Sequence, residues 1–82
     1  MHTMSNSKER VVIRYSDGTE AQVGDTVLID EKQRGVVREV VDTAEKMQTW
    51  ALDEFGLMFD GVFYPERFLH EYPVELVSRV VA

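Results

Sequence analysis

Few side chains in this sequence have clear catalytic potential. There are two histidines, His2 and His70, no cysteine, and no serine in a nucleophile-elbow pattern. Glu66 and His70 are four residues apart, so a helix would place them on one face as two ligands for a metal ion. A metal site needs three or four ligands, and no glycine-rich phosphate loop is present. The sequence therefore favours a non-enzymatic protein without a cofactor, and a small enzyme or metal protein is the alternative.

Aromatic side chains are the other candidates for function. Seven of the eight aromatic residues lie between positions 50 and 72, together with several carboxylates. Most of these rings are expected in the core, but Phe63 and Tyr64 are adjacent and must point to opposite faces of a strand. Exposed rings beside carboxylates suit a protein interface. The predicted partner-binding residues are Trp50, Asp53, Glu54, Phe55, Asp60, Phe63, Tyr64, Glu66 and Glu71.

The charge of the chain is unevenly distributed. Fifteen acidic and nine basic residues give a formal net charge of −6. Residues 1–38 hold six acids and six bases, so the whole excess lies in residues 39–82. Affinity for phosphates comes from Lys and Arg, which makes free nucleic acid a poor partner. A basic protein is the expected partner, because opposite fields steer association.

Length and composition limit the architecture. Eighty-two residues correspond to one domain, and without cysteine the fold must depend on packing alone. No apolar run approaches the length needed to cross a bilayer, and the N-terminus lacks the apolar core of a secretory signal. We expect a cytoplasmic monomer or weak dimer that does not bind a membrane, with a tail over residues 1–9 and one domain over residues 10–82.

The stretch 23–41 organises the rest of the chain. It contains two β-branched runs, 27–29 and 36–41, joined by a polar link that ends in Gly35. This pattern predicts a β-hairpin, with Gly35 in a turn or bulge. The order of glycine, aspartate and valine in it resembles the first hairpin of small SH3-like barrels.

Further strands are predicted on both sides of this hairpin. Residues 10–15 form a first strand, Asp17-Gly18 a turn, and residues 20–23 a return strand. Residues 56–60 and 62–64 flank a second turn at Asp60-Gly61, and residues 74–81 form the last strand, which pairs with an early one. In that last strand, Val74 and Leu76 alternate with Glu75 and Arg79.

Two segments have helical features. Asp42 to Glu45 matches a capping box with Asp42 as the N-cap, so residues 42–51 favour a short helical turn, with a long loop as the alternative. Residues 65–71 can form one helical turn that begins at Pro65. The sequence therefore predicts a mainly β protein, a small antiparallel barrel of five to six short strands with one or two short helical turns.

The chain also resembles a group of small bacterial proteins. The similarity spans residues 11–79 and is carried by Tyr15–Thr19, Val23–Val27, Gly35–Val37, Gly56–Phe59 and Val74–Arg79. Some members of the group resemble immunity proteins of secreted toxin systems. The resemblance implies an SH3-like β-fold and inhibition of a toxin, while residues 42–55 and 65–72 depart from the pattern.

These observations lead to one expected function and one alternative. We expect an acidic binding module that neutralises a cognate toxin, a nuclease or nucleic-acid deaminase, by covering its basic active site. In this role carboxylates replace phosphates and rings fill the substrate pocket. The alternative is a ribosome- or transcription-associated SH3-like domain that binds nucleic acid or a nucleoprotein.

Overall fold

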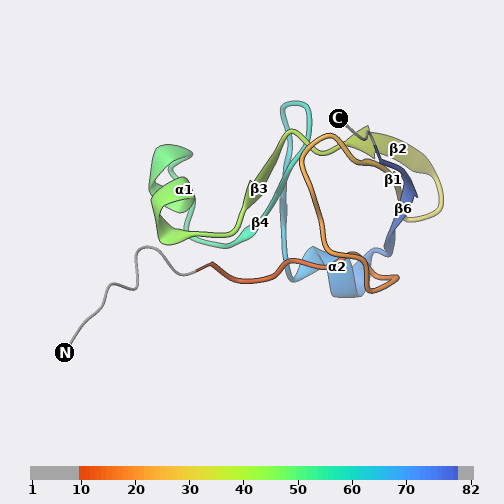
Figure 1. Ribbon diagram of the computed structural model, residues 1–82, viewed down its shortest axis with the longest axis horizontal. Coiled ribbons are helices and arrows are strands. Elements are labelled where there is room, and N and C mark those ends of the chain that lie inside the picture. Colours follow the sequence, from red (N-terminus) through yellow and green to blue (C-terminus); the bar gives the residue numbers. More distant parts are fainter. Residues whose placement is uncertain (1–9, 80–82) are drawn as a thin grey trace.

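The computed structural model describes residues 10–79 and shows a small, mainly β protein (Figure 1). The six strands are Thr26–Ile29 (β1), Gln33–Val36 (β2), Glu39–Val41 (β3), Gly56–Met58 (β4), Phe63–Pro65 (β5) and Val74–Ser78 (β6). The two helices are Ala44–Thr49 (α1) and Phe68–Glu71 (α2). The predicted tail and the last three residues lie outside the described part.

The strands form two antiparallel sheets of three strands each. One sheet has the order β2-β1-β6 and the other the order β3-β4-β5. β1 pairs with β2 and with the last strand, β6, as the sequence predicted. The mainly β class and the predicted numbers of strands and helices are confirmed. No single closed barrel forms among residues 10–79, so the SH3-like barrel stays a prediction.

The chain passes between the two sheets twice, directly from β2 to β3 and through α2 from β5 to β6. The sequence predicted one strand over residues 36–41, but this run is interrupted between β2 and β3. Val37 donates its amide to Asp25 in the first sheet (2.9 Å), and Arg38 donates to Met58 in the second (2.7 Å). Neighbouring residues of an extended chain direct their amides to opposite sides. The chain therefore leaves one sheet and enters the other at this point.

The core lies between the two sheets. Its fully buried side chains come from every part of the described chain and include Ile13, Val27, Val37, Leu57 and Val74. Half-buried residues such as Phe55 and Tyr64 pack against this cluster. Burial of apolar surface contributes about 25 cal/mol per Å², so this shared core is the main stabilising contact between the sheets.

The N-terminal segment corrects one prediction. Residues 10–23 contain no regular strand, and only an isolated bridge joins Arg14 and Glu20. The turn at Asp17 is present, because the carboxylate of Asp17 accepts a hydrogen bond from the amide of Thr19 (2.9 Å). The segment instead runs over the core with Ile13 buried. The segment pairs with itself only around this bridge, through Tyr15 to Thr19 and Ala21 to Ile13, while Val11 bonds to Asp42, so no continuous ladder forms.

The central hairpin is confirmed, with its turn at the start of the predicted polar link and β2 beginning within that link. Asp30 and Glu31 both have positive φ angles, 54° and 60°, and form the turn between β1 and β2. Gly35 lies within β2, opposite Val27, with no positive φ. An added Cβ at Gly35 would lie 3.2 Å from Ile29 Cδ1 and 3.3 Å from Phe59 Cδ1. Glycine at this position lets the Ile29 and Phe59 side chains lie close against the strand.

Both predicted helical segments form helices, but each helix begins at a different residue from the one predicted. α1 forms in place of the alternative long loop, but its N-cap is Thr43 rather than Asp42. The Thr43 hydroxyl accepts a hydrogen bond from the amide of Lys46 (3.1 Å). Asp42 is buried instead, 3.4 Å from the Arg10 guanidinium and 3.3 Å from Lys46 Nζ. α2 begins at Phe68 rather than at Pro65, because Pro65 is still the last residue of β5 and pairs with Gly56. Tyr72 is extended, as expected before a proline.

Candidate functional site

The nine predicted partner-binding residues are spread over several surfaces. Trp50 ends α1 and is 47% exposed, and Asp53 is exposed nearby in the chain. Figure 1 shows α1 at the opposite end of the molecule from β2 and β6. The structure therefore does not collect the predicted residues on one common face.

The remaining predicted residues occupy distinct environments. Glu54 is paired with Arg67 (Oε1 to Nε, 2.9 Å), which raises the pKa of the Arg67 guanidinium through this hydrogen bond and charge contact. Asp60 and Tyr64 line a groove beside β2. The others are placed as follows: Phe55 packs against the core, Phe63 is half-buried, Glu66 lines a second pocket, and Glu71 is exposed at the end of α2.

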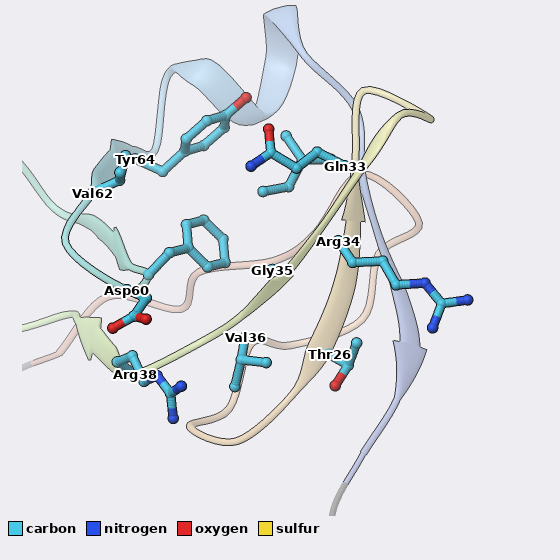
Figure 2. A pocket seen from close by; sticks show the side chains of 11 residues that line it. Thr26, Gln33, Arg34, Gly35, Val36, Arg38, Asp60, Val62 and Tyr64 are labelled. Atoms are coloured by element: carbon cyan, nitrogen blue, oxygen red, sulfur yellow. The ribbon is translucent and has the colours of Figure 1, made fainter.

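A hollow lies between β2 and the turn that joins β4 to β5. We call it the intersheet groove, and its volume is about 550 Å³. Figure 2 shows its two walls, with Gln33 to Val36 on one side and Asp60, Val62 and Tyr64 on the other. The lining residues are Thr26, Ile29, Gln33, Arg34, Gly35, Val36, Arg38, Phe59, Asp60, Val62 and Tyr64.

The turn from Phe59 to Val62 sets the position of the second wall. Phe59 donates its amide to the carbonyl of Val62 (2.8 Å), and Gly61 provides the positive φ of 77° that so tight a turn requires. The Phe59 side chain points inward and is buried. Val62, in contrast, is 56% exposed at the edge of the groove.

Four aromatic rings form a continuous chain beside this groove. Edge-to-face contacts join Phe59 to Tyr64 (5.8 Å between centroids), Tyr64 to Phe68 (5.3 Å) and Phe68 to Tyr72 (5.7 Å). Such contacts stabilise a pair by about 0.5–1.5 kcal/mol beyond burial. Burial, together with the charge of Asp30, raises the pKa of Tyr64, so its hydroxyl stays protonated at neutral pH. The rings thus present a rigid, largely apolar surface.

Three cationic residues accompany the groove. Lys32, Arg34 and Arg38 lie on or next to β2, and no carboxylate of the described residues is within 4.0 Å of them. Arg38 and Asp60 both line the groove without forming an ion pair. Counting charges by halves of the chain concealed this cluster. The sequence signal was available, because residues 32–38 contain three cations and no acid.

A second charged cluster has the opposite character. Asp25 is fully buried, and its carboxylate accepts hydrogen bonds from the Tyr15 hydroxyl (2.6 Å) and from Arg79 Nε (2.8 Å). It also accepts a hydrogen bond from the amide of Gln22 (3.0 Å). Burial alone would raise the pKa of Asp25, but these donors, Arg79 first, hold it below its usual range. Burial and the bond to Asp25 raise the pKa of Tyr15.

This buried cluster also corrects the prediction for the last strand. The alternation of β6 placed Arg79 on the solvent side with Glu75. Arg79 follows β6 and turns inward, where its terminal nitrogen also donates to the carbonyl of Glu20 (2.7 Å). A buried carboxylate without a cation would be costly, and this explains the inward course.

The Glu66–His70 pair lies in a different pocket. Both residues line a hollow of about 340 Å³ together with Arg14, Tyr15 and Leu69. Among residues 10–79, no three His, Asp or Glu side chains are grouped so that they could hold a metal ion. The pair therefore has no third ligand within the described part of the chain.

Comparisons with known proteins found no match among family models, curated proteins or solved structures. The resemblance to small bacterial immunity proteins thus stays a prediction. Neither helix of residues 10–79 is long and apolar enough to cross a membrane.

Proposed function

We propose that this chain is a non-enzymatic protein-binding module of SH3-like architecture, which holds an extended segment of a protein partner in the intersheet groove. Two features support the architecture. The β2–β3 run is shared by two antiparallel three-stranded sheets, and the last strand returns to β1. Both features are expected of a small barrel whose strands pair in sequence and close with the last one.

The groove is the observation that carries this proposal. Binding sites are usually concave and mostly apolar, with a few polar groups that fix orientation. Here Ile29 and Phe59 lie against Gly35 and provide apolar lining. Figure 2 shows Arg38 and Asp60 at one end of the hollow. A hollow beside an edge strand suits an extended peptide. The net charge of −6 favours a protein over a nucleic acid as the occupant.

A photo-crosslinking experiment tests the proposal with a matched pair of positions. Val62, on the groove wall, and Val23, outside it, are similarly exposed at 56% and 59%. Each valine is replaced in turn by p-benzoylphenylalanine. The variant is then irradiated inside cells of the organism that produces the protein. We expect a discrete protein adduct with the Val62 variant and none with the Val23 variant. Identical adducts from both positions, or an adduct that only nuclease removes, would overturn the proposal.

The partner of this module is, in our further proposal, a toxin with a basic active site. Fourteen carboxylates lie within residues 10–79, and nine of them have no cation of the described residues within 4.0 Å. The exposed Trp50 lies three residues before one of these nine, Asp53, in the chain. Exposed carboxylates without cations support electrostatic attraction to a basic protein.

A pull-down with the product of the neighbouring gene tests the toxin proposal. We expect a complex that weakens as the salt concentration rises, because screening reduces attraction between exposed charges. Asp53→Lys should weaken it more than the control Glu75→Lys, which changes the same charge on β6. A salt-insensitive complex, or no complex, would contradict this role.

Nucleic-acid binding is the second candidate function, and the cations of residues 32–38 beside four rings favour it. Basic grooves with aromatic platforms bind single strands. A gel shift with a twelve-nucleotide oligothymidine at moderate salt tests this function. A retarded band that Arg38→Ala abolishes would support it, and no retardation at any salt concentration would eliminate it.

A further inference from the structure

The two sheets have four edge strands, and three of these edges are protected. On β6, Val74 donates its amide to the Ser16 hydroxyl (2.8 Å), and Leu76 donates to the Asp17 carboxylate (3.1 Å). The end of β3 is covered where the carbonyl of Asp42 accepts the amide of Val11 (2.9 Å). β5 ends in Pro65, which has no amide hydrogen to offer. Such protection prevents unwanted strand pairing.

The outer edge of β2 is the exception. Among the described residues, Gln33–Val36 pair only with β1. Val37 directs its amide toward Asp25 on the β1 side, and backbone direction alternates along a strand. The amide and carbonyl of Gly35 therefore also point toward β1, while the amides and carbonyls of Arg34 and Val36 point outward. Four residues of open edge span about 13 Å, enough for a short added strand.

This open edge borders the intersheet groove. Figure 2 shows the Arg34 side chain directed away from the hollow, so it is the backbone of β2 that faces the space toward Asp60 and Val62. Gly35 has no side chain, and the Phe59 ring lies directly against it. The space next to this edge is therefore bordered by the apolar Phe59 ring, and Gly35 places no side chain in it.

We propose that the outer edge of β2 is a strand-addition site, which takes an extended segment of the partner protein carrying acidic side chains. This proposal rests on the proposed protein-binding function and names how the groove holds its occupant. Arg34 and Val36 exchange backbone hydrogen bonds with the added strand. Lys32, Arg34 and Arg38 face acidic side chains of that strand, since cross-strand pairs of opposite charge are favourable.

Charge distinguishes this occupant from a second copy of the same chain. Pairing of two β2 edges would bring together the two sets of Lys32, Arg34 and Arg38. Like charges across a strand pair are destabilising, whereas an acidic strand supplies the missing counter-charges. The nearest alternative, homodimerisation through β2, is therefore an outcome that the test must detect.

Hydrogen exchange of individual amides tests the proposal on the intact chain. The probe is the acetylated and amidated peptide Glu-Val-Glu-Val-Glu-Val, and its control replaces each Glu with Lys. With the acidic peptide at about ten times its Kd, we expect the amides of Arg34 and Val36 to exchange about tenfold more slowly. The basic peptide should leave both amides unchanged. Equal protection by both peptides, or by neither, would overturn the proposal.

Two variants separate the backbone contribution from the charge. Arg34→Pro removes an amide that faces outward, while Arg34→Ala removes only the side chain. We expect Arg34→Ala to weaken peptide binding several-fold and Arg34→Pro to abolish it, while both keep the amide spectrum of the folded protein. If Arg34→Pro proves unfolded, the exchange measurement on the unmodified chain still decides the question.

The outcomes separate this inference from the proposed function. Shifts at Phe59, Val62 and Tyr64 without protection of Arg34 and Val36 would overturn strand addition but leave the groove as a protein-binding site. Protection of the same amides without peptide, growing with protein concentration and accompanied by a doubled mass in sedimentation, would overturn it in favour of a second copy. Failure of the Val62 crosslink would overturn the function itself.

Discussion

Two parts of the molecule bring arginine and aspartate together in opposite ways. In the buried cluster, Arg79 donates two hydrogen bonds to Asp25, and the Tyr15 hydroxyl and the Gln22 amide donate two more. In the intersheet groove, Arg38 and Asp60 both line the hollow but form no ion pair. The same residue types thus stabilise the fold in one place and stay available in the other. Burial makes the difference, because a buried charge must have a partner and an exposed one need not.

The largest expected effect comes from breaking the buried cluster. Asp25→Asn removes the charge that Arg79 and Tyr15 contact, and we expect it to lower the free energy of unfolding by about 3 kcal/mol. Asp60→Asn is the matched control in the groove and should change it by less than about 0.5 kcal/mol. Urea unfolding followed by Trp50 fluorescence measures both. Equal losses would show that the two sites do not differ in this way.

A second comparison uses two glycines, the buried Gly56 of β4 and Gly35 of β2 beside the groove. At Gly56, an added Cβ would collide with the carbonyl of Tyr64 and approach the backbone of Pro65. Gly56→Ala should therefore cost about 2–3 kcal/mol. Gly35→Ala meets only the ends of the Ile29 and Phe59 side chains, which can move, so about 1 kcal/mol or less is expected. Thermal unfolding distinguishes these losses, and a larger loss at Gly35 would contradict the comparison.

Acid should weaken the buried cluster specifically. The folded-state pKa of Asp25 is lowered, so its contribution to stability is present above the unfolded pKa of about 3.9 and is lost as the pH falls through the lower folded value. The difference in unfolding free energy between the unmodified chain and Asp25→Asn should therefore shrink below about pH 4. Denaturant titrations at several pH values measure it. A difference that stayed constant down to pH 2 would refute the role of this carboxylate.

The smallest expected effect on stability is at the groove. Arg34→Glu changes an exposed side chain without an ion pair among the described residues, so the free energy of unfolding should move by less than about 0.5 kcal/mol. The substitution should instead lower the affinity for the acidic peptide and raise the affinity for the basic peptide. Fluorescence anisotropy with labelled peptides measures both affinities. An unchanged preference would leave the groove without an electrostatic role.

Local patterns in the sequence predicted local structure well. The hairpin formed by β1 and β2, the turn at Asp60-Gly61 and the helix after Asp42 all depend on neighbouring residues. The errors are of a different kind. Residues 10–15 have strong β-propensity but no regular strand, because they pair with the following residues only around one bridge, and Val11 bonds to Asp42 instead. The 36–41 run changes sheets in the middle, which β-branched composition alone cannot indicate.

The candidate site was harder to predict than the fold. Asp60 and Tyr64 were predicted and do lie in the intersheet groove. Arg34, Arg38 and Phe59 were not predicted as site residues, because their roles depend on strands that are far apart in the sequence. Trp50 was predicted together with them on the basis of proximity in sequence, yet α1 carries it to the other end of the molecule.

The sequence by itself determined the mainly β class, the positions of the turns and the excess of negative charge, because each depends on the type and spacing of nearby residues. Only the tertiary structure decided which charged side chains are buried in ion pairs and which are exposed without an ion pair. It also decided that β2 keeps a free edge beside an apolar hollow. These properties arise from contacts between distant segments, and the pairing of such segments is not encoded in any one stretch of the chain.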